Sequence, residues 1–246
     1  MINYAKPSYD DTVYKTYIRR KKYIILLVFL MCLAVGLFSL CSGSSGLTLS
    51  RIFSCFLGRG DAMTNSIVFN IRMPRIVTAV LVGILLAMSG SVMQSVLRNP
   101  LASASTLGVS QGASFGATIG IICLGAGMQG TSSSASAITI YDPAVVVGCA
   151  FVGGIISAVI ILALSKYKTM KPSSMVLVGV ALSSLFNGGT TLVQYFADDV
   201  QVSAVVFWTF GDLGRTSWKE IGILMVTAVL MFIFFMFNRW NYNAME

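Results

Sequence analysis

The sequence predicts an all-α, multi-pass membrane protein with six transmembrane helices and both termini in the cytoplasm. Hydrophobic residues make up 56% of the 246 residues and charged residues only 11%, whereas an ordinary soluble domain carries about 25% charged residues. Six apolar runs are each long enough to cross the hydrocarbon core of a bilayer, roughly 30 Å thick, as a helix. We therefore expect the chain in the cytoplasmic membrane, with one transmembrane domain (23–246) behind a cytoplasmic tail (1–22).

The first expected span follows a basic segment. The tail ends in four basic residues, Arg19–Lys22, which are typical of a cytoplasmic flank. The apolar run Tyr23–Cys41 is too long for the core of a typical signal peptide and lacks a convincing small-residue cleavage site. It is therefore predicted to be a membrane helix rather than a leader.

The second expected span, Ile76–Leu97, contains no charged residue and lies between two prolines. Pro74 suits the first turn of a helix, and Pro100 stops the helix at the other end. Small and polar residues recur at every fourth position and predict a packing face; they are Gly83, Ala87, Ser91 and Ser95, with Gln94 beside them. The half-apolar segment Leu47–Leu57 is expected to form a short helix at the membrane surface.

The third expected span runs from Thr106 to Gly125 and contains a ridge of glycines. They fall at every fourth position, at Gly108, Gly112, Gly116 and Gly120. Glycines at this spacing let two helix backbones approach closely, so we predict that these four residues pack helices together. A loop without basic residues, Ala126–Tyr141, follows.

Start signals mark the last three spans, which are expected at Pro143–Leu164, Ser173–Phe196 and Trp218–Phe237. Asp142 before proline is typical of an N-cap and a first-turn residue, and Ser217-x-x-Glu220 has the pattern of a capping box. The segment Asp198–Arg215 predicts a short, partly exposed helix. A four-residue step of small and polar residues also follows the fifth span, at Gly179, Ser183, Asn187 and Thr191.

The distribution of basic residues sets the expected topology. With six spans, eleven of the 17 Lys and Arg residues fall on the side of the termini and six on the other side. Cytoplasmic loops are enriched in Lys and Arg, so this bias places both termini in the cytoplasm. It also explains the net charge of +8 without a nucleic-acid partner.

The composition excludes several kinds of chemistry. The chain has no histidine and nine acidic residues, none at the centre of an expected span. A zinc or di-iron site, a histidine-based catalytic dyad and a proton-relay carboxylate are therefore not expected. No G-x-x-x-x-G-K-[ST] loop is present, so we predict a non-enzymatic chain that binds no nucleotide, metal or other cofactor. The five cysteines are interpreted as packing residues, although Cys41 and Cys55 could pair on the outer side.

Two arginines on the expected outer side, Arg72 and Arg75, flank Pro74. One interpretation is that they mark the boundary of the lipid headgroups. The other is that they dock carboxylates of an external partner, because a planar guanidinium grips a carboxylate through two parallel hydrogen bonds. The residues alone leave both interpretations open.

Five ordered motifs resemble the FecCD-type permeases, the membrane subunits of binding-protein-dependent ABC importers for iron-siderophore, heme and cobalamin. The motifs are R-M-P-R at 72–75, L-L-A-M-S-G-S-V-M-Q at 85–94, R-N-P-L-A at 98–102, L-G-V-S-Q-G-A at 107–113 and F-W-T-F-G-D-L-G at 207–214. The resemblance covers residues 23–246 and implies that they form the N-terminal part of a ten-helix permease domain.

The resemblance also implies roles for individual residues. Arg72 and Arg75 match arginines that receive acidic residues of a substrate-binding protein. Two polar turns match the cytoplasmic gate of such permeases, at Asn99, Leu101, Ser173 and Ser174, although ordinary loops have the same composition. The small and polar faces of the second, third and fifth helices are expected to line the translocation path, with Gln94, Ser95, Ser184 and Asn187 as candidate contacts.

The implied function is that of a permease subunit that translocates an iron-siderophore complex across the cytoplasmic membrane. The expected partners are cytoplasmic ATP-binding subunits, an extracytoplasmic substrate-binding protein, the lipid bilayer, and a second permease that is identical or homologous. Import of heme or cobalamin by the same mechanism is an alternative. An inactive truncated scaffold and a secondary transporter are two more, although a secondary transporter is expected to carry an acidic residue or histidine within a span.

Two departures from the family pattern affect these expectations. The family usually has an acidic or small residue and then proline after N-P-L-A, whereas this sequence has Ser103 and Ala104, so we expect a less stiff turn. The family also continues past the N-A-M-E-like position into a coupling helix and four more membrane helices, whereas this sequence ends at Glu246. A truncated gene, a fragment and one half of a split permease would each explain that end.

Overall fold

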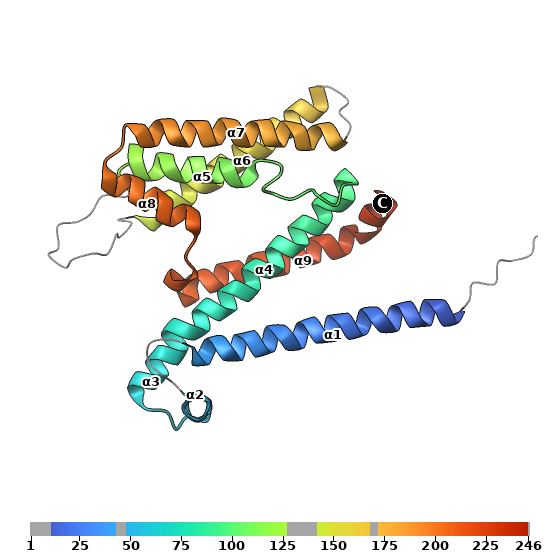
Figure 1. The fold of residues 1–246 in the computed structure, drawn as a ribbon, viewed down its shortest axis with the longest axis vertical. Helices are drawn as coiled ribbons and strands as arrows, with labels where there is room; N and C mark the ends of the chain where they lie inside the picture. The colour runs from blue at the N-terminus through green and yellow to red at the C-terminus, as the bar shows by residue number, and fades with distance from the viewer. Residues whose placement is uncertain (1–10, 43–47, 127–141, 168–171, 246) are drawn as a thin grey trace, which may run out of the picture. The chain divides into compact units, whose positions relative to one another are not determined.

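The computed structural model describes residues 11–42, 48–126, 142–167 and 172–245, and every regular element within these ranges is a helix (Figure 1). The α-helices are α1 (Asp11–Cys41), α2 (Leu49–Phe56), α3 (Ala62–Ser66), α4 (Met73–Leu97), α5 (Val109–Thr118), α6 (Pro143–Tyr167), α7 (Pro172–Tyr195), α8 (Asp199–Phe210) and α9 (Trp218–Met245). Two π-helices, η1 (Ile67–Arg72) and η2 (Ile119–Cys123), and a 3-10 helix, η3 (Leu213–Arg215), interrupt or join them. The predicted all-α class is confirmed.

Five helical stretches in the described residues are long and apolar enough to cross a membrane, namely Tyr14–Cys41, Ala62–Leu97, Pro143–Lys166, Ser173–Tyr195 and Trp218–Tyr242. They match the first, second, fourth, fifth and sixth expected spans. Helices of this length and composition make the chain a multi-pass membrane protein. The count of six spans and the cytoplasmic position of the termini stay predictions.

The expected third span is a shorter apolar helix, Val109–Cys123. At about 1.5 Å per residue it covers about 22 Å, less than the hydrocarbon core. It begins later than expected because Thr106 belongs to a hydrogen-bonded turn with Ser103. Gly108 then takes a left-handed conformation, with φ of 76°, as the N-cap residue of α5.

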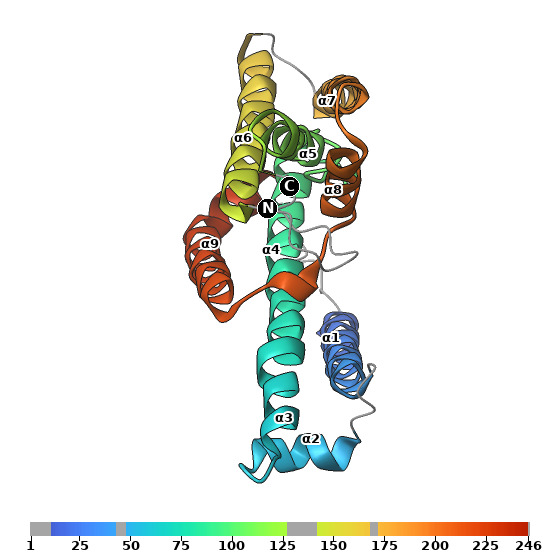
Figure 2. The ribbon, with the colours of Figure 1, turned by 90° about the vertical axis from the view of Figure 1, so that its left-hand side faces the viewer.

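The chain divides into two compact units, residues 1–77 with 216–218, and residues 78–215 with 219–246. In the first unit, α2 crosses the base of the continuous helix that α3 and η1 begin (Figure 2). Leu40, Ile52, Cys55 and Val68 form the core of this unit. The short helix expected at Leu47–Leu57 is thus confirmed as α2, and both Cys41 and Cys55 are free thiols.

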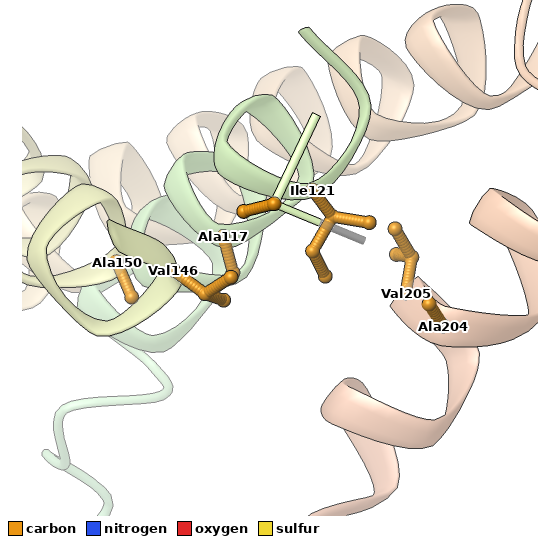
Figure 3. Close-up of a cluster of buried hydrophobic side chains, with 7 residues drawn as sticks. Ala117, Ile121, Val146, Ala150, Ala204 and Val205 are labelled. Carbon is orange, nitrogen blue, oxygen red and sulfur yellow. The ribbon is translucent and has the colours of Figure 1, made fainter. Parts of the chain in front are cut away.

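The second unit is built around α5, which packs against α6 and α7 (Figure 1). Side chains of α5 and η2 lie between α6 and α8, where they form a buried cluster (Figure 3): Ala117, Ile121, Val146, Ala150, Ala204 and Val205. A second cluster joins α4, the following turn, α6 and α7: Leu97, Ala102, Leu107, Ile161, Leu182 and Phe186. The short helix expected in Asp198–Arg215 is confirmed as α8.

Helix starts follow local chemistry. One carboxylate oxygen of Asp142 accepts the amides of Ala144 and Val145, at 3.1 and 3.4 Å, so the predicted N-cap of α6 is confirmed. The sequence did not reveal the capping box at α8, which Asp198 and Gln201 form. α9 begins at Trp218, directly after the predicted cap residue.

Helix α1 begins at Asp11, so the second half of the expected tail is helical and continuous with the first span. Because Thr, Lys, Arg and Tyr side chains are all compatible with a helix, the polar composition of this stretch did not end it. Several expectations fall outside the described residues: the first part of the tail (1–10), nearly all of the loop Ala126–Tyr141, and Lys168 and Lys171 after the fourth span. The division at residue 22 stays a prediction.

Candidate docking and gate residues

The two arginines of the R-M-P-R motif lie in different surroundings. Arg72, at the end of η1, is half-buried, and its guanidinium donates a hydrogen bond to the carbonyl oxygen of Leu40 in the last turn of α1. Arg75, in the first turn of α4, is exposed. Arg75 is therefore available to an external carboxylate, whereas Arg72 is already engaged within its own unit.

A second bond from a distant part of the chain reaches the same segment. The indole Nε1 of Trp218 donates to the carbonyl oxygen of Phe69, in η1, at 3.0 Å. Sequence reasoning missed Leu40 and Trp218 as partners of the motif. A tryptophan at the start of a helix was the only signal, because the partners are main-chain carbonyls that every residue carries.

The turn after α4, which contains the expected gate residues Asn99 and Leu101, is held by several hydrogen bonds. The amides of Arg98 and Asn99 donate back to the carbonyls of Ser95 and Gln94, at 3.2 and 3.1 Å, which is a Schellman arrangement. Arg98 has the left-handed φ of 45° that this arrangement requires. The helix end is therefore fixed by its backbone.

Side chains complete the same turn. The carboxamide oxygen of Asn99 accepts the amide of Leu101 at 3.0 Å, and the Gln94 Nε2 donates to the Pro100 carbonyl at 3.1 Å. Leu101 is 75% exposed, so a braced turn presents an apolar side chain. The expected pathway residue Gln94 is thus part of this turn in the structure.

Ser103 and Thr106 continue the turn where the family usually has a proline. The Ser103 amide donates to the Thr106 hydroxyl oxygen at 2.8 Å, and the Thr106 amide donates to the Ser103 hydroxyl oxygen at 3.2 Å. The sequence-based expectation was a less stiff turn. Reciprocal hydrogen bonds, rather than a pyrrolidine ring, hold this segment.

The other expected gate residues open α7. Ser173 is exposed and Ser174 is half-buried. Met175, which follows them, packs against the cluster that contains Leu97 and Ala102, on either side of the Asn99–Leu101 turn. One apolar cluster therefore contains residues adjacent to both predicted gate segments.

The remaining pathway candidates lie on exposed or half-exposed helix faces. The hydroxyl of Ser95 donates to the Ser91 carbonyl and that of Ser184 to the Val180 carbonyl, both at 3.1 Å. Ser184 and Asn187 are both exposed, three residues apart on α7. The expected packing face of α4 is also exposed at Gly83, around which the described residues leave open space.

The four glycines of the third expected span lie against two different helices. An added Cβ would lie 3.0 Å from the Gly179 carbonyl oxygen of α7 at Gly108, and 2.7 Å from the Gly153 carbonyl oxygen of α6 at Gly112. At Gly116 it would overlap the carbonyl oxygen of Cys149, and at Gly120 it would lie 3.2 Å from the Cβ of that cysteine. Gly112 and Gly116 leave no room for a side chain, and Gly108 and Gly120 lie in contacts tighter than ordinary van der Waals contacts.

The partner glycine Gly153 was missed by sequence reasoning. A Cβ there would overlap the Gly112 carbonyl oxygen, so the contact between α5 and α6 is glycine on glycine. The signal available was the Gly153–Gly154 pair inside an apolar helix, where glycine has the lowest helix propensity of any residue except proline.

Within the described ranges, no three Cys, Asp or Glu residues come together as metal ligands.

Comparison with known proteins gives one family. The model of the FecCD transport family matches residues 29–246. A protein of Methanocaldococcus jannaschii that carries the name of an ABC transporter permease is 43% identical over 233 residues, which are 95% of this chain and 66% of that protein. The hemin transport system permease of Yersinia pestis is 32% identical over 83% of this chain and 58% of its own length. Further relatives are named as permeases for molybdate, vitamin B12 and an iron chelatin.

A solved structure has the same fold. It is described as an inward-facing conformation of a metal-chelate type ABC transporter, and it matches with a TM-score of 0.72 and 25% sequence identity. The match covers 92% of this chain and 65% of that chain. This chain therefore spans between about half and two thirds of the length of the relatives it matches.

Proposed function

The chain belongs to the FecCD transport family, and on that premise we propose that it is the membrane subunit of a binding-protein-dependent ABC importer for an iron-siderophore complex. The observation that carries the proposal is the family match across residues 29–246. Three relatives named for hemin, vitamin B12 and an iron chelatin support a metal chelate or a large cofactor as cargo, whereas one is named for molybdate. Iron-siderophore is our choice among them.

In this proposal the chain itself performs no chemistry. An extracytoplasmic binding protein delivers the chelate and docks through carboxylates on Arg75, which is exposed. Cytoplasmic ATP-binding subunits supply the energy, and a second permease, identical or homologous, completes the translocation path. The hydrogen-bonded turn at Asn99–Leu101 and the start of α7 at Ser173 and Ser174 form the inner exit.

The expected cargo contacts are weak and dispersed. The candidate path residues Ser95, Ser184 and Asn187 are uncharged, and the hydroxyls of Ser95 and Ser184 donate to carbonyls of their own helices. Such a surface holds a bulky chelate without trapping it, which transport requires. Alternating access then depends on movement of the gate segments rather than on a tight binding site.

Partner capture tests the transport class. The tagged chain is purified from membranes of its own host cells with mild detergent. Co-purification of a subunit with a G-x-x-x-x-G-K-[ST] loop and of an extracytoplasmic binding protein is expected. If neither accompanies the chain, the importer proposal is wrong, and an inactive scaffold or a secondary transporter becomes the better description.

Uptake tests the cargo. Cells that lack the chain are compared with complemented cells for uptake of radiolabelled iron-ferrichrome, hemin and cyanocobalamin. We expect ferrichrome uptake to depend on the chain and on ATP. Dependence of hemin or cyanocobalamin uptake alone would replace the siderophore assignment, and uptake driven by an ion gradient without ATP would indicate a secondary transporter.

Charge reversal tests the docking residue. Arg75→Glu should abolish capture of the binding protein, because it turns an attraction between opposite charges into repulsion. Arg51→Glu is the matched control, since Arg51 is an exposed arginine of α2 in the same unit. Equal capture by the two variants would contradict a docking role for Arg75.

A further inference from the structure

The π-helix before Pro74 leaves one main-chain carbonyl without an amide donor. In a π-helix each amide donates to the carbonyl five residues earlier, and the Met73 amide accordingly donates to the Val68 carbonyl. The next bond in this pattern would run from residue 74 to the carbonyl of Phe69. Proline has no N–H, so the helix itself cannot supply that bond.

The indole of Trp218 takes the place of the missing amide. Its Nε1 donates to the Phe69 carbonyl at 3.0 Å, across 149 positions of sequence. An indole N–H can only donate a hydrogen bond, and the Phe69 carbonyl lacks only a donor, so the two groups suit each other. Pro74 itself is fully buried, whereas the Trp218 indole that reaches the Phe69 carbonyl is 49% exposed.

Arg72 satisfies a second orphan carbonyl at the same place. The last carbonyls of a helix have no donor within that helix, and the Arg72 guanidinium donates to the carbonyl of Leu40, in the final turn of α1. A cation is also favoured at a helix C-terminus by the helix dipole. Two side chains thus hold η1, one from its own end and one from the start of α9.

We propose that Trp218 and Arg72 are positioning residues that fix the start of α4, and that Arg75 alone of the two motif arginines binds the carboxylate of the docking partner. Only the part about Arg75 and the docking partner rests on the proposed function. Pro74 makes the arrangement specific, because it both creates the orphan carbonyl and separates the engaged arginine from the exposed one. The tryptophan is needed only while residue 74 is a proline.

A double-mutant cycle tests the first part. Trp218→Phe in the purified full chain should lower the thermal unfolding midpoint, followed by circular dichroism in detergent micelles. Pro74→Ala gives residue 74 an amide, so that the Phe69 carbonyl has a donor in either the π or the α register. In that background Trp218→Phe should lose most of its effect.

Control measurements keep the cycle decisive. Trp240→Phe, which changes a 71% exposed tryptophan of α9, should leave the midpoint unchanged in both backgrounds. The indole hydrogen bond is observed separately by ultraviolet resonance Raman difference spectra of wild type minus Trp218→Phe. An equal effect of Trp218→Phe with proline and with alanine at 74, or a Raman difference typical of a free indole, would overturn the proposal.

The docking arm uses the binding protein that co-purifies with the native importer. Capture of the binding protein is measured at a temperature well below the lowest unfolding midpoint of the variants. Arg75→Gln should abolish this capture without changing the unfolding midpoint, whereas Arg72→Gln should lower the midpoint. Trp218→Phe should weaken capture by about fivefold, the equivalent of one ordinary hydrogen bond, and Trp240→Phe should not. If Arg75→Gln still captures the binding protein, the proposed docking function is wrong, but the result of the double-mutant cycle of Trp218 and Pro74 still stands. If Arg72→Gln and Arg75→Gln lose capture equally and neither changes the unfolding midpoint, the proposal that Arg72 positions and Arg75 binds is wrong.

Discussion

Both regions have an apolar core, but where α5 crosses α6 the backbones also touch at glycines, whereas at η1 side-chain donors bind main-chain carbonyls. Glycine against glycine, as at Gly112 and Gly153, brings the backbones of α5 and α6 together without a side chain between them. At η1 the Arg72 and Trp218 hydrogen bonds add to the apolar packing of Val68. The same membrane-spanning chain thus uses both solutions.

The difference follows from what each region lacks. Membrane helices gain little hydrophobic energy by leaving lipid, so close backbone packing through small residues is one of the few attractions available. A helix interrupted by a proline has a different problem, because an unpaired carbonyl in an apolar environment is costly. The glycine region therefore depends on shape and the η1 region on hydrogen-bond donors, which gives mutations in the two regions different signatures.

The largest expected effect is steric. Gly116→Leu should destabilise the folded chain by about 3 kcal/mol or prevent folding, because its Cβ would overlap the Cys149 carbonyl oxygen in a contact with no flexible side chain to yield. Gly148→Leu, on an exposed face of α6 with open space around it, is the control and should be tolerated. Thermal unfolding in detergent measures both, and similar losses would show that the glycines are not needed for packing.

A smaller effect is expected from removal of a donor. Arg72→Met keeps most of the apolar stem but leaves the Leu40 carbonyl without its charged partner, at a cost of about 2 kcal/mol. Arg75→Met should cost almost nothing in stability, since Arg75 is exposed. The thermal unfolding midpoints of the two variants are compared, and Arg72→Met should have the lower one. A lower midpoint for Arg75→Met would contradict the different surroundings of the two arginines.

An aspartate holds the N-cap position of one helix in each unit, so the same substitution can be compared in both units. Asp142→Ala should cost about 1 kcal/mol, because its carboxylate accepts the amides of Ala144 and Val145 at the start of α6. Asp61→Ala is the control in the other unit, where Asp61 holds the N-cap position of α3 without a side-chain cap bond. Chemical denaturation of both variants checks the prediction, which fails if Asp61→Ala costs as much.

Local signals predicted the local features. The apolar runs, the short helices α2 and α8 and the Asp142 cap all depend on residues within one or two turns of one another, and each was found from the sequence. The bonds of Arg72 to Leu40 and of Trp218 to Phe69 were not. Main-chain carbonyls leave no trace in a sequence, and neither partner lies within one helix turn of its donor.

The third expected span shows a different kind of limit. Its glycine ridge was recognised, but the division of that ridge between α7 at Gly108 and α6 from Gly112 onward depends on tertiary packing. Its start was placed too early because hydropathy does not distinguish a helix from a hydrogen-bonded turn such as Ser103–Thr106. Sequence motifs predicted the candidate docking and gate residues, whereas only the three-dimensional structure shows that the two motif arginines lie in different surroundings.

The smallest effect concerns a hydroxyl inside the glycine-packed region. Ser157 is fully buried beside Gly112, and among the described residues its Oγ has no hydrogen-bond partner. Thr118, equally buried in α5, donates to the Ser114 carbonyl at 2.9 Å. Ser157→Ala should therefore be neutral or stabilising by up to about 1 kcal/mol, while Thr118→Val loses a bond and is destabilising by a similar amount. If Ser157→Ala proves as harmful as Thr118→Val in thermal unfolding, this region also depends on polar contacts, and its distinction from the η1 region narrows.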